Sequence, residues 1–423
     1  MRRLFLVLGA LLLIASCTAG EAETTLAPSS TTTESPSPTT ATTTSAATTT
    51  TTTTSAPTTT TPPTPYGVPA DPRQGPAPPP PGVVEGFEGV GVVTVGAGGA
   101  PLHEAPGGDP FVTAREGLMF SAQQQRGDWI EVFTTCDAVA WVKAADVLAQ
   151  PPAEPGSIGE GFDFAKATIV IDPGHGGPWN TGAASPSGLA EKTVNLDIAR
   201  RVRDLLSEPR SVDWSTGAIL NGTDIPPAGW VILTRTGSGD EGDYEAGLFY
   251  RSFLANAANA HAMVAIHNNA GWEVRLDSPG SDVYYQSQVP ESRRFAKIMV
   301  EELLRSFAPF EADWVGALET GAKSRLSPRD GNPQYYGILR RSEMPTVIAE
   351  GVYISNQSEA ELLATAEFRQ AYADAVYRAL VRFLTSDDTG DGSDSDPQVW
   401  YGDAGSGDAR PDCVIPSQDS PDE

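Results

Sequence analysis

Residues 168–177 read Thr-Ile-Val-Ile-Asp-Pro-Gly-His-Gly-Gly. An apolar, β-branched run that stops at an acidic residue and a glycine-rich turn is typical of a buried strand ending in a loop. Three further apolar runs end as sharply, and helical periodicity appears in three longer segments. The runs are 230–234, 262–266 and 346–349, and the helical segments are 191–206, 291–307 and 358–384. Strands alternating with helices predict an α/β fold, an open and mostly parallel sheet with flanking helices.

Chemistry-bearing residues follow three of these runs. His175 lies in the turn after the first run, His267 directly follows the third, and Glu350 follows the fourth. Ligands of open α/β sheets bind at the carboxyl ends of the strands, so we expect one cleft to collect all three. Each has a plainer interpretation when taken alone, as a solvated loop histidine or an ordinary charge at a strand end. His103 and His261 are expected to be structural or solvent-facing.

Glu191 begins the helical segment 191–206 and lies on its apolar stripe, which continues through Val194 and Ile198. The carboxylate is therefore expected to face the sheet. One explanation is a favourable interaction with the helix dipole. The other is a cation, because a carboxylate directed inward needs a partner. Two histidines and one glutamate would satisfy a zinc ion and leave a fourth position for water.

Six motifs occur in a fixed order between Lys166 and Leu384. They are 171–177, Glu191-Lys192, 233–235, Arg251 with Ala255-Asn256, 266–268 and 345–356. In this order and content the segment, about half of the chain, resembles the zinc-dependent N-acetylmuramoyl-L-alanine amidases of bacterial cell division and sporulation.

The resemblance implies a set of roles for the residues above. His175, Glu191 and His267 would bind Zn²⁺, and Glu350 would be the catalytic general base. The reaction would be hydrolysis of peptidoglycan at the amide between N-acetylmuramic acid and L-alanine of the stem peptide. Two alternatives stay open: an inactive amidase-fold lipoprotein that binds the cell wall, and a zinc peptidase acting on the stem peptide.

Further residues receive expected supporting roles. Asp172 is expected to support the His175 loop from behind, or to act only as a turn former before Pro173. Arg340 and Asn268 are expected to contact the substrate. The segment 207–229 looks like an insertion. An inhibitory helix displaced by an activator protein, known in some members of this family, would fall in 311–332.

The ends of the chain differ in composition from this segment. Residues 1–16 are expected to be a lipoprotein signal peptide, with Cys17 lipidated and anchoring the protein to the outside of the membrane; an ordinary signal peptide is the alternative. Residues 17–84, rich in Thr and Pro, are expected to be a disordered stalk that lets the protein reach the cell wall. The net charge of -26 excludes nucleic acid as a partner.

The remaining segments complete the predicted organisation. Residues 85–150 resemble a bacterial SH3-like domain, a small all-β barrel that would bind the wall, and 151–164 are a linker. The catalytic domain is placed at 165–386, and 387–423 are expected to be an acidic disordered tail. In an oxidising compartment, Cys136 and Cys413 either pair in a disulfide or remain two unrelated thiols.

Overall fold

The computed structural model describes residues 91–154, 156–177, 180–237, 246–271, 274–328, 331, 333–401 and 413–417. The predicted signal peptide, Cys17 and the stalk lie outside the described residues. Within the described ranges, no helix has both the length and the apolar character needed to cross a bilayer.

The centre of the α/β part is a six-stranded sheet with the strand order β11-β8-β12-β18-β14-β16. The strands are β8 (Thr168–Pro173), β11 (Trp230–Leu233), β12 (Ala262–Asn269), β14 (Asp282–Tyr285), β16 (Gly321–Lys323) and β18 (Thr346–Tyr353). Neighbouring strands run parallel except β14 and β18, which pair antiparallel. The four apolar runs of the sequence form β8, β11, β12 and β18, which confirms the mostly parallel sheet.

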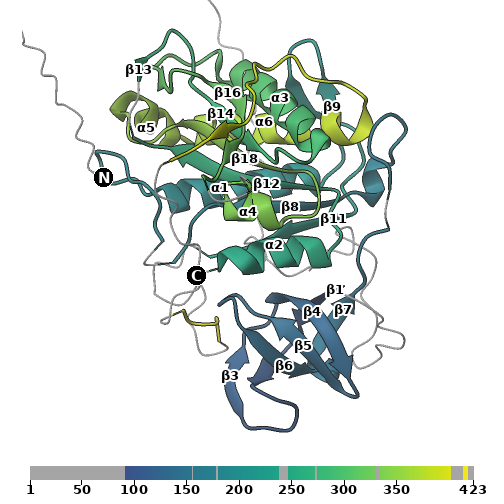
Figure 1. Ribbon diagram of the computed structural model, residues 1–423. Helices are drawn as coiled ribbons and strands as arrows, with labels where there is room; N and C mark the ends of the chain where they lie inside the picture. The colour runs from purple at the N-terminus through teal and green to yellow at the C-terminus, as the bar shows by residue number, and fades with distance from the viewer. Residues whose placement is uncertain are drawn as a thin grey trace, which may run out of the picture. The chain divides into compact units, whose positions relative to one another are not determined.

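Helices cover both faces of this sheet (Figure 1). One face packs against α1 (Glu191–Leu206), α3 (Pro290–Phe307) and α6 (Ala366–Thr385), and the other against α2 (Leu248–Ala257) and α4 (Gly337–Arg341). The two faces follow from the alternation of side chains along each strand. Ile169 and Ile171 of β8 belong to the first apolar core, and Val170 between them belongs to the second.

The predicted helix 358–384 is two helices, α5 (Gln357–Leu363) and α6. The break lies at Thr365, whose backbone is extended and whose side chain accepts a hydrogen bond from the Phe368 amide. Threonine is a favoured residue at the start of a helix because its oxygen satisfies one of the first free amides. The apolar periodicity continues through this break, so it could not reveal it.

The structure describes two segments to which the sequence analysis gave a special role, the insertion at 207–229 and the stretch 311–332. The stretch 207–229 contains an antiparallel hairpin of β9 (Arg210–Asp213) and β10 (Ala218–Asn221). The described residues of 311–332 form β15 (Val315–Gly316), β16 and β17 (Arg325–Leu326) and contain no helix. An inhibitory helix is therefore not found in these described residues, because parts of their backbone pair with neighbouring strands instead.

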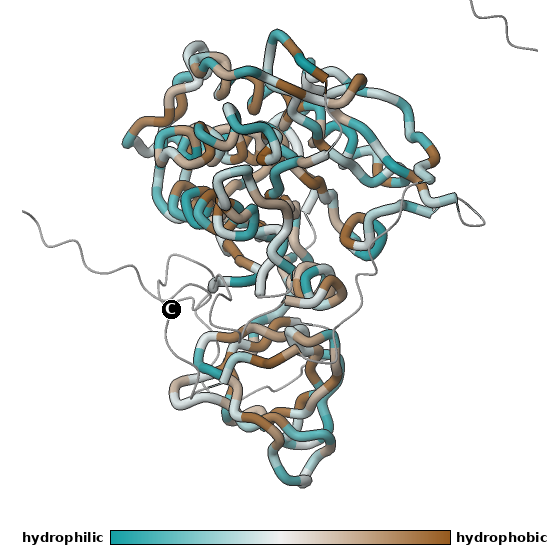
Figure 2. Tube along the Cα trace, turned by 90° about the vertical axis from the view of Figure 1, so that its left-hand side faces the viewer, coloured by the Kyte–Doolittle hydropathy of each residue, from teal (hydrophilic) through white to brown (hydrophobic). Residues whose placement is uncertain are grey.

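Residues 91–150 form an all-β unit ahead of the α/β part. Its strands are β1 (Gly91–Val95), β2 (Ala100–His103), β3 (Pro110–Ala114), β4 (Met119–Arg126), β5 (Trp129–Phe133), β6 (Val139–Lys143) and β7 (Val147–Gln150). They pair antiparallel in one seven-stranded sheet. Apolar and polar stretches are mixed along the chain of this unit (Figure 2), and its strands contribute fully buried apolar residues such as Val93, Phe120 and Val142. Its SH3-like character stays a prediction.

The segment after α6 differs from the expected disordered tail. In residues 387–401, Asp388 pairs with Arg382 at 2.5 Å, and Asp394 pairs with Arg293 at 2.8 Å. Further on, β19 (Gln398–Val399) pairs with β17. The acidic composition that suggested disorder is satisfied here by arginines of α3 and α6. A disulfide joins Cys413 to Cys136 of the all-β unit, with the two Cα atoms 5.6 Å apart.

A buried ion pair between α3 and α6 allows a stability prediction. Glu302 is fully buried, and its two oxygens lie 2.6 Å from Arg378 Nε and 2.6 Å from Arg382 Nη1. Glu302→Gln is expected to lower the free energy of unfolding by about 3–5 kcal/mol, because it leaves the buried guanidinium group of Arg378 without its carboxylate, while Arg382 keeps Glu301 and Asp388. Chemical denaturation measures this change.

The neighbouring residue provides the control. Glu301 also pairs with Arg382, at 3.0 Å, but its side chain is 26% exposed. Glu301→Gln should therefore change the free energy of unfolding by no more than about 1 kcal/mol. Equal losses in the two variants would contradict the expectation that burial of the Glu302 carboxylate makes its contacts cost more to break than those of Glu301.

Candidate metal centre

His175 lies just past the end of β8, in the glycine-rich turn. Its backbone has φ +63°, a conformation that costs a non-glycine residue about 1 kcal/mol or more. Arg251 of α2 holds this conformation by donating a hydrogen bond from Nη2 to the His175 carbonyl oxygen at 2.6 Å. The ring Nδ1 lies 2.8 Å from Oδ1 of Asn180, which fits an Nδ1–H donor and leaves Nε2 free to bind a ligand.

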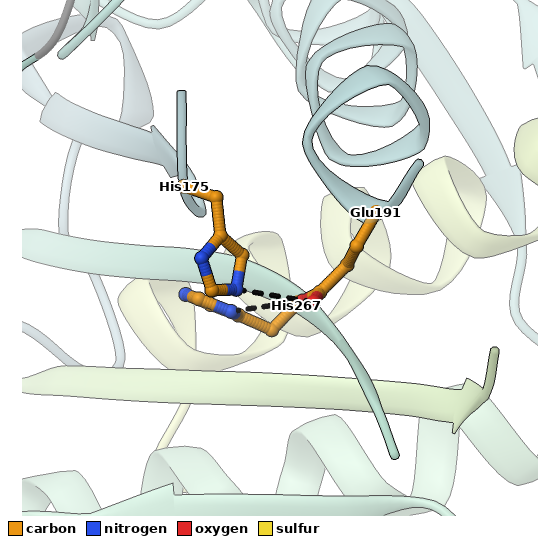
Figure 3. A group of neighbouring side chains, drawn as sticks. All are labelled: His175, Glu191 and His267. Atoms are coloured by element: carbon orange, nitrogen blue, oxygen red, sulfur yellow. Dashed lines mark hydrogen bonds and ion pairs between the residues drawn. The ribbon is translucent and has the colours of Figure 1, made fainter. Parts of the chain in front are cut away.

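Glu191 is the first residue of α1 and is 3% exposed. Its carboxylate accepts hydrogen bonds from the backbone amides of Ala183 at 2.8 Å and Asn268 at 3.1 Å. His175 Nε2 and His267 Nδ1 each lie 3.1 Å from one of its oxygens (Figure 3). Burial alone would raise the pKa of Glu191, but the contacts with both histidines outweigh it and lower the pKa. The carboxylate is therefore ionised and faces the sheet, as the apolar stripe predicts.

His267 comes from β12, and its ring meets that of His175 edge to face with centroids 4.8 Å apart. Gly174 makes this approach possible, because a Cβ atom at that position would collide with the His267 ring. Burial lowers the pKa of His267, which favours the neutral ring that binds metals. For His175, burial would also lower the pKa, but the hydrogen bond and charge of Glu191 raise it overall.

The three side chains form a donor set suited to a metal ion. One ligand atom from each of His175, Glu191 and His267 lies within 4.8 Å of the other two. Two imidazole nitrogens and one carboxylate oxygen match the ligands of catalytic zinc, which sits about 2.0–2.2 Å from each. In the part of the chain that the structure describes, no other group of three His, Cys, Asp or Glu residues is placed this way. The site therefore fits zinc in ligand type and number.

Glu350 lies beside this group on the adjacent strand. It pairs in register with His267 across the parallel strands β12 and β18, so the two side chains project from the same face. Its Oε2 is buried and has no hydrogen-bond partner among the described residues. Burial raises the pKa of Glu350 well above its usual value, and the charges of Glu191 and Asp282 raise it further. A half-buried carboxylate whose Oε2 is buried and uncommitted is a suitable proton acceptor and donor.

Asp172 supports the histidine loop indirectly. Its Oδ1 pairs with Arg251 Nη1 at 2.6 Å and also accepts a hydrogen bond from the Thr234 hydroxyl. The same guanidinium group donates to the carbonyl oxygens of Pro173 and His175. Asp172 thus holds Arg251 in the position from which Arg251 binds the His175 loop.

The two residues expected to contact substrate differ in their placement. Asn268 is 2% exposed, and its side-chain amide donates to Asn195 Oδ1 at 2.9 Å while its backbone amide donates to Glu191. Asn268 follows His267, so the strand alternation turns it to the opposite face. The expectation for Asn268 is therefore corrected. Arg340 donates from Nη1 to the carbonyl oxygens of Gln334 at 2.6 Å and of Tyr335 at 3.1 Å, but its side chain is exposed, so its contact with substrate stays a prediction.

Other supporting residues were not assigned roles from the sequence. Arg235 is completely buried and donates to the carbonyl oxygens of Pro173, Gly174, Lys192 and Gly237. Arg235 and Arg251 lie in the quoted motifs, and an arginine next to a buried strand signals a buried partner. Asn180 gave no such signal.

The other two histidines lie outside the centre. His261 accepts a hydrogen bond from the Thr168 amide at 3.0 Å, and it lines a cavity of about 970 Å³ beside the linker. His103 Nδ1 lies 2.7 Å from the Gly108 carbonyl oxygen. Both positions agree with the expected structural roles.

The fold and the site together define an α/β protein with a His–Glu–His group that could hold a metal ion and an adjacent half-buried glutamate at the carboxyl edge of its sheet. Residues 169–216 and 227–382 match the family model described as N-acetylmuramoyl-L-alanine amidase. The gap between the two matched segments lies within the stretch 207–229 that the sequence marks as an insertion. These two segments, just under half of the chain, are therefore similar to the N-acetylmuramoyl-L-alanine amidase family.

Individual amidases are also similar to this chain in sequence. The chain is 29% identical over 219 residues to the germination-specific N-acetylmuramoyl-L-alanine amidase of Bacillus subtilis, covering 51% of this chain and 79% of the relative. It is 30% identical over 219 residues to the amidase LytC of the same organism, a match that covers 51% of this chain and 35% of LytC. It is 26% identical over 247 residues to the amidase AmiA of Escherichia coli, a match that covers 52% of this chain and 76% of AmiA. The solved structure of AmiC2 of Nostoc punctiforme is 27% identical, covers 52% of this chain and 97% of its own, and has a TM-score of 0.38.

Proposed function

We propose that this protein is a zinc-dependent N-acetylmuramoyl-L-alanine amidase that hydrolyses the bond between N-acetylmuramic acid and L-alanine in peptidoglycan. The observation that carries the proposal is the placement of His175, Glu191 and His267 within ligand distance of one another, with Glu350 on the adjacent strand. The amidase relatives supply the substrate class.

Each residue of the site has a distinct part in this reaction. Bound zinc would lower the pKa of a coordinated water to about 7 and polarise the scissile carbonyl. Glu350 takes a proton from the attacking water and passes it to the leaving amine of L-alanine. Its raised pKa suits both transfers, because the group must accept the proton and then release it. Asn180 and Arg251 keep His175 oriented throughout.

The setting of the reaction extends this proposal. A lipid anchor on Cys17 and a stalk over 17–84 would hold the enzyme outside the membrane within reach of the wall. The all-β unit would bind the wall as an SH3-like domain, and an activator protein would control access to the site. The two alternative functions predict different products, since an inactive wall-binding protein releases nothing and a peptidase cuts within the stem peptide.

Metal removal tests the proposal. Solubilisation of purified sacculi is expected to stop after the metal is stripped with a chelator, and to return when one equivalent of Zn²⁺ is added, because zinc supplies the activated water. Turbidity of the sacculi measures the reaction, and elemental analysis confirms that the metal has been removed. Undiminished solubilisation by metal-free protein would contradict the proposed function.

A further inference from the structure

Helix α2 lacks a capping side chain of its own. It begins at Leu248, and the preceding residue, Gly247, has no side chain to accept a hydrogen bond. The first amides of a helix need such acceptors, and aspartate is among the preferred ones. Here the acceptor comes from the all-β unit: Asp137 Oδ1 accepts from the Tyr250 amide at 2.6 Å, and Oδ2 accepts from the Phe249 amide at 3.3 Å. The cap and the helix are 113 residues apart in the sequence.

The glycine at position 247 fits this arrangement. Its φ of −58° and ψ of 153° are open to any residue, so backbone conformation does not require glycine. Glycine is required here by the lack of space, because a Cβ atom at position 247 would collide with the Asp137 carboxylate. The Gly247 amide also donates to the Thr135 carbonyl oxygen at 2.8 Å. The Asp137 carboxylate thus occupies the place of a local cap.

Other contacts fix the capping loop against α2. The Tyr250 hydroxyl donates to the Met119 carbonyl oxygen at 2.8 Å, and the rings of Phe133 and Phe253 meet edge to face at 4.8 Å. One apolar core contains residues from both the all-β unit and the α2 face of the sheet. Cys136, next to Asp137, is held by the disulfide to Cys413.

The capped end of α2 contacts the proposed metal centre through Arg251. Arg251 lies in the first turn of the helix, is 4% exposed, and pairs with Asp172 at 2.6 Å. It donates to the Pro173 carbonyl oxygen at 2.9 Å and to the His175 carbonyl oxygen at 2.6 Å. A shift of this helical turn therefore moves the backbone of a metal ligand that is held in a strained conformation.

We propose that Asp137 is a positioning residue for the metal centre: by capping α2 from the all-β unit, it holds Arg251 and through it the His175 loop. The inference rests on the proposed zinc site. The all-β unit would then have two functions, because its β5–β6 loop would hold α2 and the active site in place in addition to the proposed binding of the wall.

The test compares three single variants and uses Zn²⁺ as the probe. Asp137→Gly removes the cap without straining a backbone whose φ is +55°, and Asp137→Asn keeps an acceptor oxygen. Asp109→Gly, an exposed position on the same unit, is the control. Zinc dissociation constants come from competition with a chromogenic chelator. Turnover and KM come from peptide release.

The proposal predicts different results for the variants. Asp137→Gly should weaken zinc binding by about 2- to 30-fold, the range that loss of a cap produces, and should lower kcat with little change in KM. Asp137→Asn should lose clearly less than Asp137→Gly, because it keeps an acceptor for the Tyr250 amide and loses only the longer contact with Phe249. Asp109→Gly should match the wild type. In Asp137→Gly with Gly247→Ser, the serine has room to cap α2 itself, and zinc affinity should return.

Several results would overturn the inference. One is a folded Asp137→Gly with wild-type zinc affinity and kcat; another is Asp137→Asn losing as much as Asp137→Gly. If Asp137→Gly does not fold, the double variant decides: wild-type zinc affinity supports the inference, and weak affinity or a failure to fold contradicts it. Wild-type protein that binds no zinc would reject the proposed function as well. A wild type that binds zinc and releases peptides, with unaffected variants, would reject only the role of Asp137.

Discussion

Glu350→Gln is expected to lower turnover by about 10²- to 10⁴-fold while the metal stays bound, because general acid–base catalysis contributes about that much. The amide of glutamine has nearly the same shape as the carboxylate but cannot accept the proton of the attacking water. The uncommitted Oε2 of Glu350 means that few contacts within the described residues are lost in the exchange. Peptide release from sacculi gives the turnover, and elemental analysis gives the zinc content.

Glu343→Gln serves as the matched control, since Glu343 is an exposed residue just before the same strand. Its turnover should equal that of the wild type. Turnover of zinc-loaded Glu350→Gln within about threefold of the wild type would remove Glu350 from the mechanism, because loss of a general base costs far more.

Glu191→Gln is expected to weaken zinc binding by at least about 100-fold and to abolish hydrolysis at ordinary zinc concentrations. Loss of a supporting residue already costs about 10- to 100-fold, and this change removes a charged ligand. The amides of Ala183 and Asn268 both donate to the Glu191 carboxylate, one to each oxygen. Glutamine offers one oxygen, so its NH₂ group would face a donor.

Zinc titration of the metal-free variant measures the loss, and thermal unfolding shows whether the variant is folded. Zn²⁺ at a concentration well above the weakened dissociation constant should restore part of the activity. A folded Glu191→Gln that binds zinc as tightly as the wild type would exclude Glu191 as a ligand and leave its histidine contacts as packing.

The strands and the site residues could be predicted from the sequence for a local reason. His175, His267 and Glu350 each follow a buried apolar run, and Glu191 lies on the apolar stripe of its helix. Strand ends converge in a parallel sheet, and the structure brings these side chains together.

The supporting contacts could not be predicted, because they join residues far apart in the sequence. Asp137 reaches α2 across 113 residues, and Arg251 reaches Asp172 across 79. The packed segment 387–401 was missed for the same reason, since its acidic residues find arginines on α3 and α6. Asn268 was misplaced because adjacent residues of a strand point to opposite faces.

The identity of the products released from purified sacculi tests the central claim most directly. Zinc-loaded protein is expected to release stem peptides with a free N-terminal L-alanine, and to leave glycan strands whose N-acetylmuramic acid carries a free lactyl carboxyl group. Mass spectrometry of both fractions identifies the bond that was cut. Peptides cleaved at any other bond, or no release by folded, zinc-loaded protein, would contradict the account.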